Sequence, residues 1–475
     1  MSALFRGKIN HEFATGINVL AESRHHYIRS LRVRDMTLFT VSAILLLDTL
    51  AASAAIGVSS IFWWTLLGLV FFVPYGLVSA ELGTTYPEQG GIYAWVRDTF
   101  GKRWGTRVTW LYWLNTGLWN ASVLVLFTGI FAQMFFPDLR LTTKLAIAIG
   151  LNWVIVLVTC ASLDIGKWVP NIGAIIKMIT FVALIGGGIA FALNGSEQLA
   201  NDFSLKAFMP EWRSGTQYIS TIIYGMLGFE LMSSASEEME NPARDVPRAI
   251  LASGILIFFM YVLGTFAILA AVPIDDIDLV EGLVDTLRLL FGTTAAGVAT
   301  GTLLGAFVLL TFLSNTTTWA LGANRAAAEA AIDGELPDFL AIEHSKYGTP
   351  VGAAMTMGAL ATLVLLAYGA VAGSNEDLFW KLFAASAVLF LLPYIGAVAA
   401  FYRARKIDAA RERPFRVPGG DVLAALMTTV CISILGISII LFMYVPGAGA
   451  DWPVVIGAAV PILLGEFAIR YAERK

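Results

Sequence analysis

The chain has 475 residues, of which 57% are hydrophobic and 14% are charged, and its formal net charge is −4. Soluble domains carry about 25% charged residues, so this composition excludes an ordinary soluble protein. Apolar runs of about 20 residues recur along the chain, and the alternating pattern of a membrane β-barrel is absent. The expected fold class is therefore an all-α integral membrane protein in the lipid bilayer, and no feature indicates a nucleic-acid partner.

Twelve membrane-crossing helices are expected after a basic N-terminal tail. The tail, residues 1–35, has no short apolar core followed by a small-residue cleavage site, so we expect it to remain in the cytoplasm. The spans are expected at 36–58, 61–82, 106–133, 143–162, 169–193, 216–235, 247–272, 293–320, 350–371, 378–401, 421–445 and 452–470.

Lys and Arg residues predict the orientation of the chain. They gather in the tail, in the connection between the second and third spans, and in the connection between the tenth and eleventh, as in Arg34, Arg103 and Arg405. The positive-inside rule then makes both termini cytoplasmic. The protein is expected to be a multi-pass protein of the cell (plasma or inner) membrane.

The longest outer connection is rich in acidic residues. It runs over 274–291 and includes Asp275, Asp278, Glu281 and Asp285. Two interpretations stay open, an amphipathic outer cap and a solvated acidic loop.

The order of spans predicts an inverted repeat within one transmembrane domain, 36–471. Spans one to five, 36–193, and six to ten, 216–401, have similar lengths and opposite orientation, and 421–470 adds two helices. In many secondary transporters built this way, the first helix of each half is broken near the midplane, where the substrate binds.

The sixth span carries the strongest signal for such a break. Gly225 and Gly228 lower helix propensity at mid-depth, and the ionisable Glu230 follows them. An intramembrane carboxylate indicates a functional site. The alternative is a glycine pair for close helix packing, with Glu230 satisfied by a neighbouring helix.

The first span should mirror the sixth but has no Gly or Pro at its centre. It offers Asp48, Thr49 and Ser53 instead. We therefore expect the symmetry to hold only in part. Asp48 and Glu230 are candidates to neutralise a substrate ammonium.

Aromatic residues are candidate walls of the same site. Tyr224, Trp119 and Trp319 would supply ring faces for cation–π contacts. For each Trp, a lipid-facing or packing role is the alternative.

Lys177 is the only basic residue well inside a span. Burial disfavours the charged form of a Lys side chain, whereas a nearby carboxylate favours it. Lys177 could therefore change protonation during transport, and proton coupling is one hypothesis. The other is a fixed cation that bridges spans one and five. All four histidines lie outside the spans, so Glu230, Asp48 and Lys177 are the candidates for titration.

Two charged features are expected on the cytoplasmic side. Glu81 is expected to anchor the end of its helix. The acidic and basic residues at 237–248 are expected to form inner-gate ion pairs or, alternatively, to be solvated loop charge.

Three stretches resemble the amino acid, polyamine and organocation superfamily of transporters. They are AELGTTYPEQGGIYAWV from Ala80, GFE followed by EEMENPARDVPRAI from Gly228, and NRAAAEAAIDGELP from Asn324. The resemblance covers about 36–470 and implies the leucine-transporter-type fold, five plus five inverted helices and two extra ones, working by alternating access. Among its branches, the sequence resembles glutamate/GABA antiporters.

This resemblance also implies residue roles. It places Tyr224 as the aromatic that closes over the substrate, and Trp319, Asn120, Ser386 and Tyr394 around the site. It places Lys177 where a coupling sodium ion sits in other members. The first span departs from the family's Gly-Ser-Gly break, which weakens the expectation of carboxylate binding.

The leading hypothesis is a secondary amino acid transporter, an exchanger or a proton-linked permease. The alternative is a transporter of polyamines or other organic amines. A channel is disfavoured by the broken helix with its gating aromatics. An enzyme is disfavoured because the spans contain no His, no paired cysteines and no Asp-Asp motif, so no catalytic residue, metal or cofactor is expected. No feature indicates an oligomeric state.

Overall fold

The computed structural model describes residues 32–87, 91–161, 165–194, 199–210, 215–231 and 241–474. Within this part of the chain, ten helices are long and apolar enough to cross a membrane. They match ten of the twelve expected spans, and the first and sixth spans are interrupted. The all-α membrane fold predicted from composition is confirmed.

The first half of the chain begins with an interrupted helix. The first span consists of α2 (Val33–Ile44) and α3 (Leu50–Ala54). The other elements of this half are α4 (Ser60–Leu67), the π-helical turn η1 (Gly68–Phe72), α5 (Val73–Thr85), α6 (Ile92–Phe100), α7 (Lys102–Phe135), α8 (Leu141–Ala161) and α9 (Ile165–Asn194).

The second half also begins with an interrupted helix. The described part of the sixth span is the 3-10 turn η3 (Thr216–Tyr218) and α10 (Ile219–Gly225), and the end of that span, 232–235, lies outside the described residues. The elements that follow are α12 (Pro242–Ala271), η5 (Ile274–Asp276), α13 (Gly282–Phe291), α14 (Ala295–Ile332), η6 (Asp338–Ala341), α15 (Val351–Gly369) and α16 (Asn375–Ile407).

Two further helices complete the domain. They are α17 (Gly420–Met443) and α18 (Trp452–Ala472), joined by a hairpin of β1 (Tyr444–Val445) and β2 (Gly449–Ala450). The two strands are antiparallel, with Tyr444 opposite Ala450.

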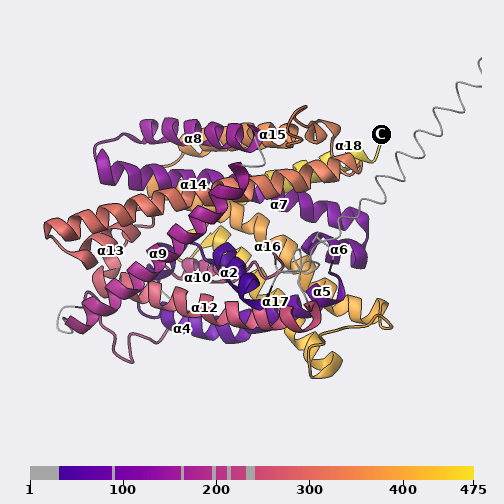
Figure 1. The fold of residues 1–475 in the computed structure, drawn as a ribbon, viewed down its shortest axis with the longest axis horizontal. Helices are drawn as coiled ribbons and strands as arrows, with labels where there is room; N and C mark the ends of the chain where they lie inside the picture. Colours follow the sequence, from indigo (N-terminus) through magenta and orange to yellow (C-terminus); the bar gives the residue numbers. More distant parts are fainter. Residues whose placement is uncertain are drawn as a thin grey trace, which may run out of the picture.

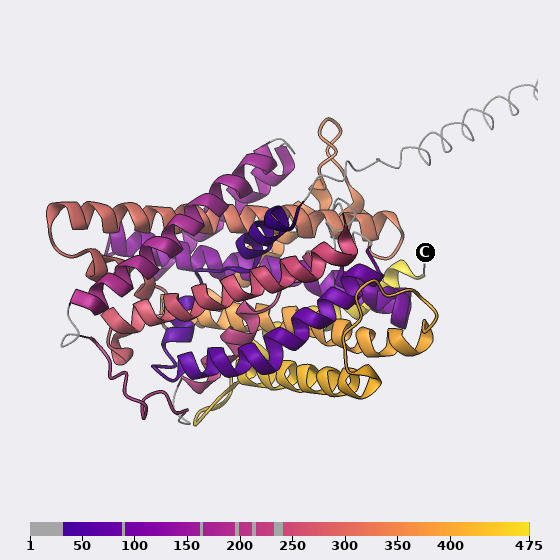
Figure 2. The ribbon, with the colours of Figure 1, turned by 60° about the horizontal axis from the view of Figure 1, so that its bottom comes forward.

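The helices form layers around a buried centre (Figure 1). Helices α8 and α15 lie together along one edge, α12 and α4 lie along the opposite edge, and α16 runs between them. Figure 2 shows α9 running obliquely across α14. In their most apolar windows, 72% of α7 and 78% of α16 is buried, against 28% of α8, so α7 and α16 form the core and α8 lies at the periphery.

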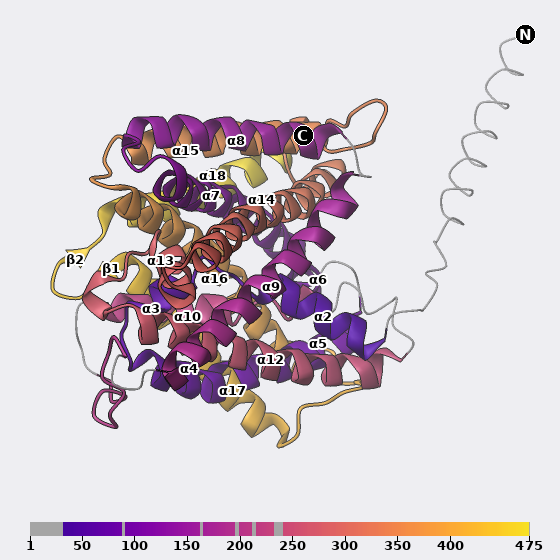
Figure 3. The ribbon, with the colours of Figure 1, turned by 60° about the vertical axis from the view of Figure 1, so that its left-hand side comes forward.

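The interrupted spans lie inside this assembly (Figure 3). Helices α2, α3 and α10 occupy the middle of the molecule, between the α8 and α15 layer and the layer of α12, α4 and α17. The breaks in the first and sixth spans are therefore enclosed by protein, where irregular backbone is tolerated at membrane depth.

The acidic connection over 274–291 contains the amphipathic helix α13. Its Leu283, Val284 and Leu287 are buried, whereas Asp285 and Arg288 on the other face are exposed to solvent in part. Of the two interpretations left open by the sequence, the amphipathic cap is the one found.

Candidate functional site

The first span is broken although it has no Gly or Pro there, so it mirrors the sixth span more fully than the partial symmetry expected from the sequence. Helix α2 ends at Ile44, and Leu45 is extended, with φ −69° and ψ 114°. The Tyr261 hydroxyl on α12 donates to the Ile44 carbonyl and accepts from the Leu46 N–H, both at 2.9 Å. A side chain from a distant helix therefore satisfies the backbone groups that the break releases, and no glycine is needed.

The sixth span is broken at its glycines, as predicted. Helix α10 ends at Gly225, and Gly228 has a φ of +127°, a conformation that favours glycine. A Cβ at Gly228 would lie 2.7 Å from Cγ1 of Ile44. Gly228 therefore permits the close approach of the two broken segments.

Glu230 is held by two tyrosines. The hydroxyl of Tyr394 donates to Oε1 at 2.6 Å, and the hydroxyl of Tyr75 donates to Oε2 at 3.1 Å. Glu230 is only 4% exposed. These bonds fix the position of a carboxylate on the wall of the larger cavity described below.

Asp48 lies in the break of the first span and links it to α7. Its Oδ2 accepts a hydrogen bond from Nε1 of Trp119 at 2.9 Å, and its charge interacts with that of Lys177. Lys177 also donates from Nζ to the Ser42 carbonyl at 2.7 Å. Lys177 on α9 thus contacts the end of α2, which fits both hypotheses for this residue.

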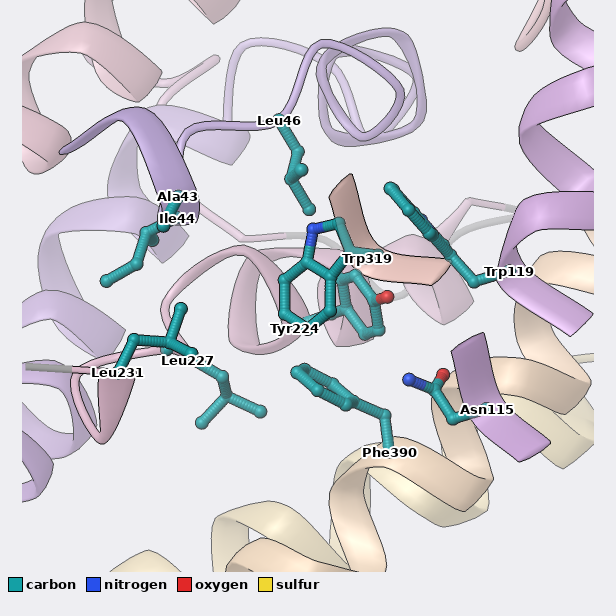
Figure 4. Close-up of a pocket in the computed structure, with 11 residues that line it drawn as sticks. Ala43, Ile44, Leu46, Asn115, Trp119, Tyr224, Leu227, Leu231, Trp319 and Phe390 are labelled. Carbon is teal, nitrogen blue, oxygen red and sulfur yellow. The ribbon is translucent and has the colours of Figure 1, made fainter. Parts of the chain in front are cut away.

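Two adjacent cavities lie beside the broken segments. The smaller cavity has a volume of about 20 Å³ and the larger about 760 Å³. Ala43, Leu231 and Trp319 line both and so separate them. Figure 4 shows the residues around the smaller cavity.

Aromatic rings form much of the wall of the smaller cavity (Figure 4). The rings of Trp119 and Trp319 meet edge to face with centroids 6.0 Å apart, and those of Tyr224 and Phe390 lie 5.0 Å apart. Asn115 adds a polar group. This combination of ring faces and one amide suits a small cationic group.

The larger cavity is bounded by the ends of several helices. Its lining includes Tyr93 on α6, Thr109 and Tyr112 near the start of α7, and Ala326 near the end of α14. Among the described residues that line the two cavities, Glu230 carries the only formal charge.

An aromatic cluster lies beyond the smaller cavity. Tyr218 meets Trp380 edge to face with centroids 4.7 Å apart, and Tyr224 meets Phe383 at 5.0 Å. Trp380 also packs on Phe442 of α17 at 5.9 Å. Phe442 lies at the end of α17, next to the β-hairpin, so the cluster extends from Tyr224 at the smaller cavity toward the hairpin.

Several predicted site residues do not line either cavity. Asn120 donates to the Thr316 carbonyl at 3.3 Å, and Ser386 donates to the Phe383 carbonyl at 2.7 Å. Ser53 bonds the Leu50 carbonyl and the Thr265 hydroxyl, Thr49 is buried beside the break, and Gly225 packs against Tyr261. Their roles in substrate binding remain predictions.

Some residues of the site were not predicted from sequence. They are Asn115, Phe390, Tyr75, Tyr112 and Tyr261. A signal was available for Asn115, because it precedes Trp119 by four positions and so shares a helix face with it, whereas Asn120 falls on the neighbouring face.

Of the charged residues expected on the cytoplasmic side, the structure describes Glu81 and the last part of the cluster at 237–248. Glu81 accepts a hydrogen bond at 2.8 Å from Nε of Arg405, a second from its Nη2, and one at 2.7 Å from the Val417 N–H. Glu81 therefore anchors the end of α5 to the loop after α16. Of the cluster at 237–248, Arg244 pairs with Asp245 at 3.1 Å, and residues 237–240 lie outside the described residues.

Comparison with known proteins was consistent with this architecture. The sequence matches the amino acid permease family over residues 31–464. It is 36% identical to a probable agmatine/putrescine antiporter of Lactococcus lactis subsp. lactis, over 91% of this chain and 93% of that protein. A probable polyamine transporter of Arabidopsis thaliana is 28% identical over 76% of this chain and 70% of its own. A glutamate/gamma-aminobutyrate antiporter of Lactococcus lactis subsp. lactis is 25% identical over 80% and 78%.

Proposed function

Because the chain belongs to the amino acid permease family, within the amino acid, polyamine and organocation superfamily, it is a secondary transporter, and we propose that it exchanges cationic amines. The observation that carries this proposal is the charge of the cavities. Glu230 is the only formally charged side chain among the described residues lining them, and Asp48 lies directly behind Trp119. A site of this kind favours a cation and gives a free carboxylate no cationic partner.

The relatives support the same substrate class. The antiporter that is 36% identical is named for agmatine and putrescine, and both compounds carry two cationic ends. Amino acid exchange, the leading hypothesis from sequence, is the second candidate, because a relative named as a glutamate/gamma-aminobutyrate antiporter also aligns over most of the chain.

We assign the larger cavity to the cytoplasmic entrance. Its lining comes from α6 and the adjoining ends of α7 and α14, and the distribution of Lys and Arg predicts a cytoplasmic position for these ends. The aromatic cluster of Tyr218, Trp380 and Phe442 would then close the outer side. In alternating access, opening of this cluster and closure of the larger cavity would expose the site to the outside.

The position of Lys177 supports a coupling role. Its ammonium group bonds the end of α2 and interacts with Asp48, so loss of its proton would weaken the attachment of the broken first span to α9. We propose that Lys177 takes the place of a coupling cation, which makes exchange independent of sodium. Transport by Lys177→Ala that keeps its full rate and pH response would contradict this role.

Exchange by purified protein in liposomes tests the proposed function. Vesicles are loaded with unlabelled putrescine, with glutamate or with buffer, and uptake of labelled putrescine is followed. We expect uptake that requires putrescine inside. Uptake of labelled glutamate into glutamate-loaded vesicles, with no movement of putrescine, would replace the proposal with amino acid exchange.

A further inference from the structure

The side-chain oxygen of Asn115 is buried without a hydrogen-bond partner among the described residues. It lies in the middle of α7, is 3% exposed, and its Oδ1 has no partner among the described residues. Burying an amide oxygen in this way costs about 1–3 kcal/mol. Such a group in a native structure therefore requires an explanation, and a ligand that supplies the missing bond is one.

Asn115 lines the smaller cavity, and Figure 4 shows its amide nitrogen, rather than its oxygen, on the side of Phe390. Its amide lies beside the rings of Trp119 and Phe390, with Tyr224 and Trp319 completing the aromatic wall. The volume of about 20 Å³ is enough for one water molecule, which needs roughly 10–15 Å³. A primary ammonium group has about the size of a water molecule, whereas a guanidinium or a trimethylated ammonium is larger.

The chemistry of the cavity selects among groups of that size. Ring faces attract cations. Rotation of the Asn115 amide about its terminal bond exchanges the positions of its oxygen and nitrogen, which brings the buried oxygen to the cavity and to a donor there. A carboxylate would meet the negative faces of four rings and would have only the amide N–H₂ as a donor. The cavity therefore suits an ammonium group better than a carboxylate.

We propose that Asn115 determines specificity by accepting a hydrogen bond from a primary ammonium group that enters the smaller cavity. The remainder of the amine lies in the larger cavity, where Glu230 faces its second cationic end. This inference rests on the proposed function and names the residue that distinguishes primary amines from other cations. Trp319, which separates the cavities, has to move for the substrate to span them.

Two substitutions of Asn115 have different expected effects on the KM for putrescine. In putrescine-loaded liposomes, Asn115→Leu removes the acceptor and should raise the KM for putrescine about tenfold. Asn115→Asp keeps the shape and adds a negative charge, so it should leave that KM unchanged or lower it. Thr128→Val, on the same helix but outside both cavities, is the matched control and should behave as the wild type.

Three outcomes would overturn the role of Asn115. The first is an unchanged KM for putrescine in Asn115→Leu, and the second is a higher KM in Asn115→Asp than in Asn115→Leu. The third concerns the fully N-methylated, bis-quaternary analogue of putrescine: inhibition of wild-type uptake by this analogue that is as strong as inhibition by putrescine itself. The analogue has no N–H to donate, so we expect inhibition at least tenfold weaker. Absence of putrescine exchange by the wild type would instead contradict the proposed function, so the two failures are distinguishable.

Discussion

At the scale of single residues, Asp48 combines a structural and an electrostatic role. It accepts the indole N–H of Trp119 and thereby orients a ring of the smaller cavity, and it also places a negative charge close to that cavity. The two roles can be separated because an amide oxygen still accepts a hydrogen bond but carries no charge.

Substitution Asp48→Asn should therefore reduce amine transport through loss of charge alone. We expect kcat/KM for putrescine to fall at least tenfold, since neutralising the partner of a bound cation removes on the order of 2 kcal/mol of binding free energy. The fluorescence of Trp119 should change little, because its hydrogen bond is retained. Comparison with Asp48→Ala, which removes both the charge and the bond, serves as control, and wild-type transport by Asp48→Asn would show that the charge does not act on the substrate.

Glu81 also illustrates how one residue fixes a longer segment. Its carboxylate is 2% exposed and faces Arg405, which is equally buried, and Arg413 at 3.4 Å. Removing one partner of a buried ion pair costs about 3–5 kcal/mol, because the other charge remains buried.

We predict that Glu81→Gln lowers the thermal midpoint of the protein in detergent, with a loss of about 3–5 kcal/mol in the free energy of unfolding. The control is Asp98→Asn, which removes a pair with Arg97 at 2.7 Å whose side chains are 29% and 31% exposed. That substitution should cost at most about 1 kcal/mol. Equal midpoints for the two variants would contradict the role of Glu81 as an anchor.

At the scale of elements, the ten continuous spans could be predicted because each is a long apolar run. The break in the sixth span was also predictable, because Gly225 and Gly228 act locally. The break in the first span was not, because its released backbone groups are satisfied by Tyr261, a residue more than 200 positions away. The cavity-lining position of Asn115 likewise depends on the packing of α7 against α14 and α16, which one sequence does not specify.

The stability of helix α13 is expected to depend on pH. Burial is the main cause that raises the pKa of Glu281 above its ordinary value, with a contribution from the nearby Asp278, and burial likewise raises the pKa of Asp285 against the opposing effect of Arg288. For a carboxyl group with a raised pKa, the folded state binds the proton more tightly than the unfolded state does. The contribution of these two carboxyl groups to the free energy of unfolding is therefore complete below their ordinary pKa of about 4. It is lost as the pH rises through their raised pKa values.

We predict that amides of α13 exchange hydrogen faster, after correction for the intrinsic rate, as the pH is raised from about 4 to 7. In Glu281→Gln this dependence should be smaller, because the amide does not titrate. Corrected exchange that is independent of pH in the wild type, or slower at high pH, would contradict the prediction.

At the scale of the whole molecule, the described residues enclose a large cavity on the side of α6 and form an aromatic cluster on the side of α13. The broken segments of the first and sixth spans meet at Ile44 and Gly228 between these two regions. A secondary transporter of this family needs a site that each side can reach in turn, and this position meets that need. The charge and the aromatic walls of the site then decide which solute is carried.

The central claim is that the site selects a cationic amine. Comparing the binding of two compounds that differ at one end tests this claim most directly. Putrescine and 4-aminobutyrate share a primary amine on a short chain and differ in whether the other end is an ammonium or a carboxylate. Titration calorimetry on the purified protein should detect putrescine binding and no comparable binding of 4-aminobutyrate. In Glu230→Gln, the affinity for putrescine should fall on the order of thirtyfold, which corresponds to a loss of about 2 kcal/mol of binding free energy. Binding of 4-aminobutyrate as tight as that of putrescine, unaffected by Glu230→Gln, would contradict the account.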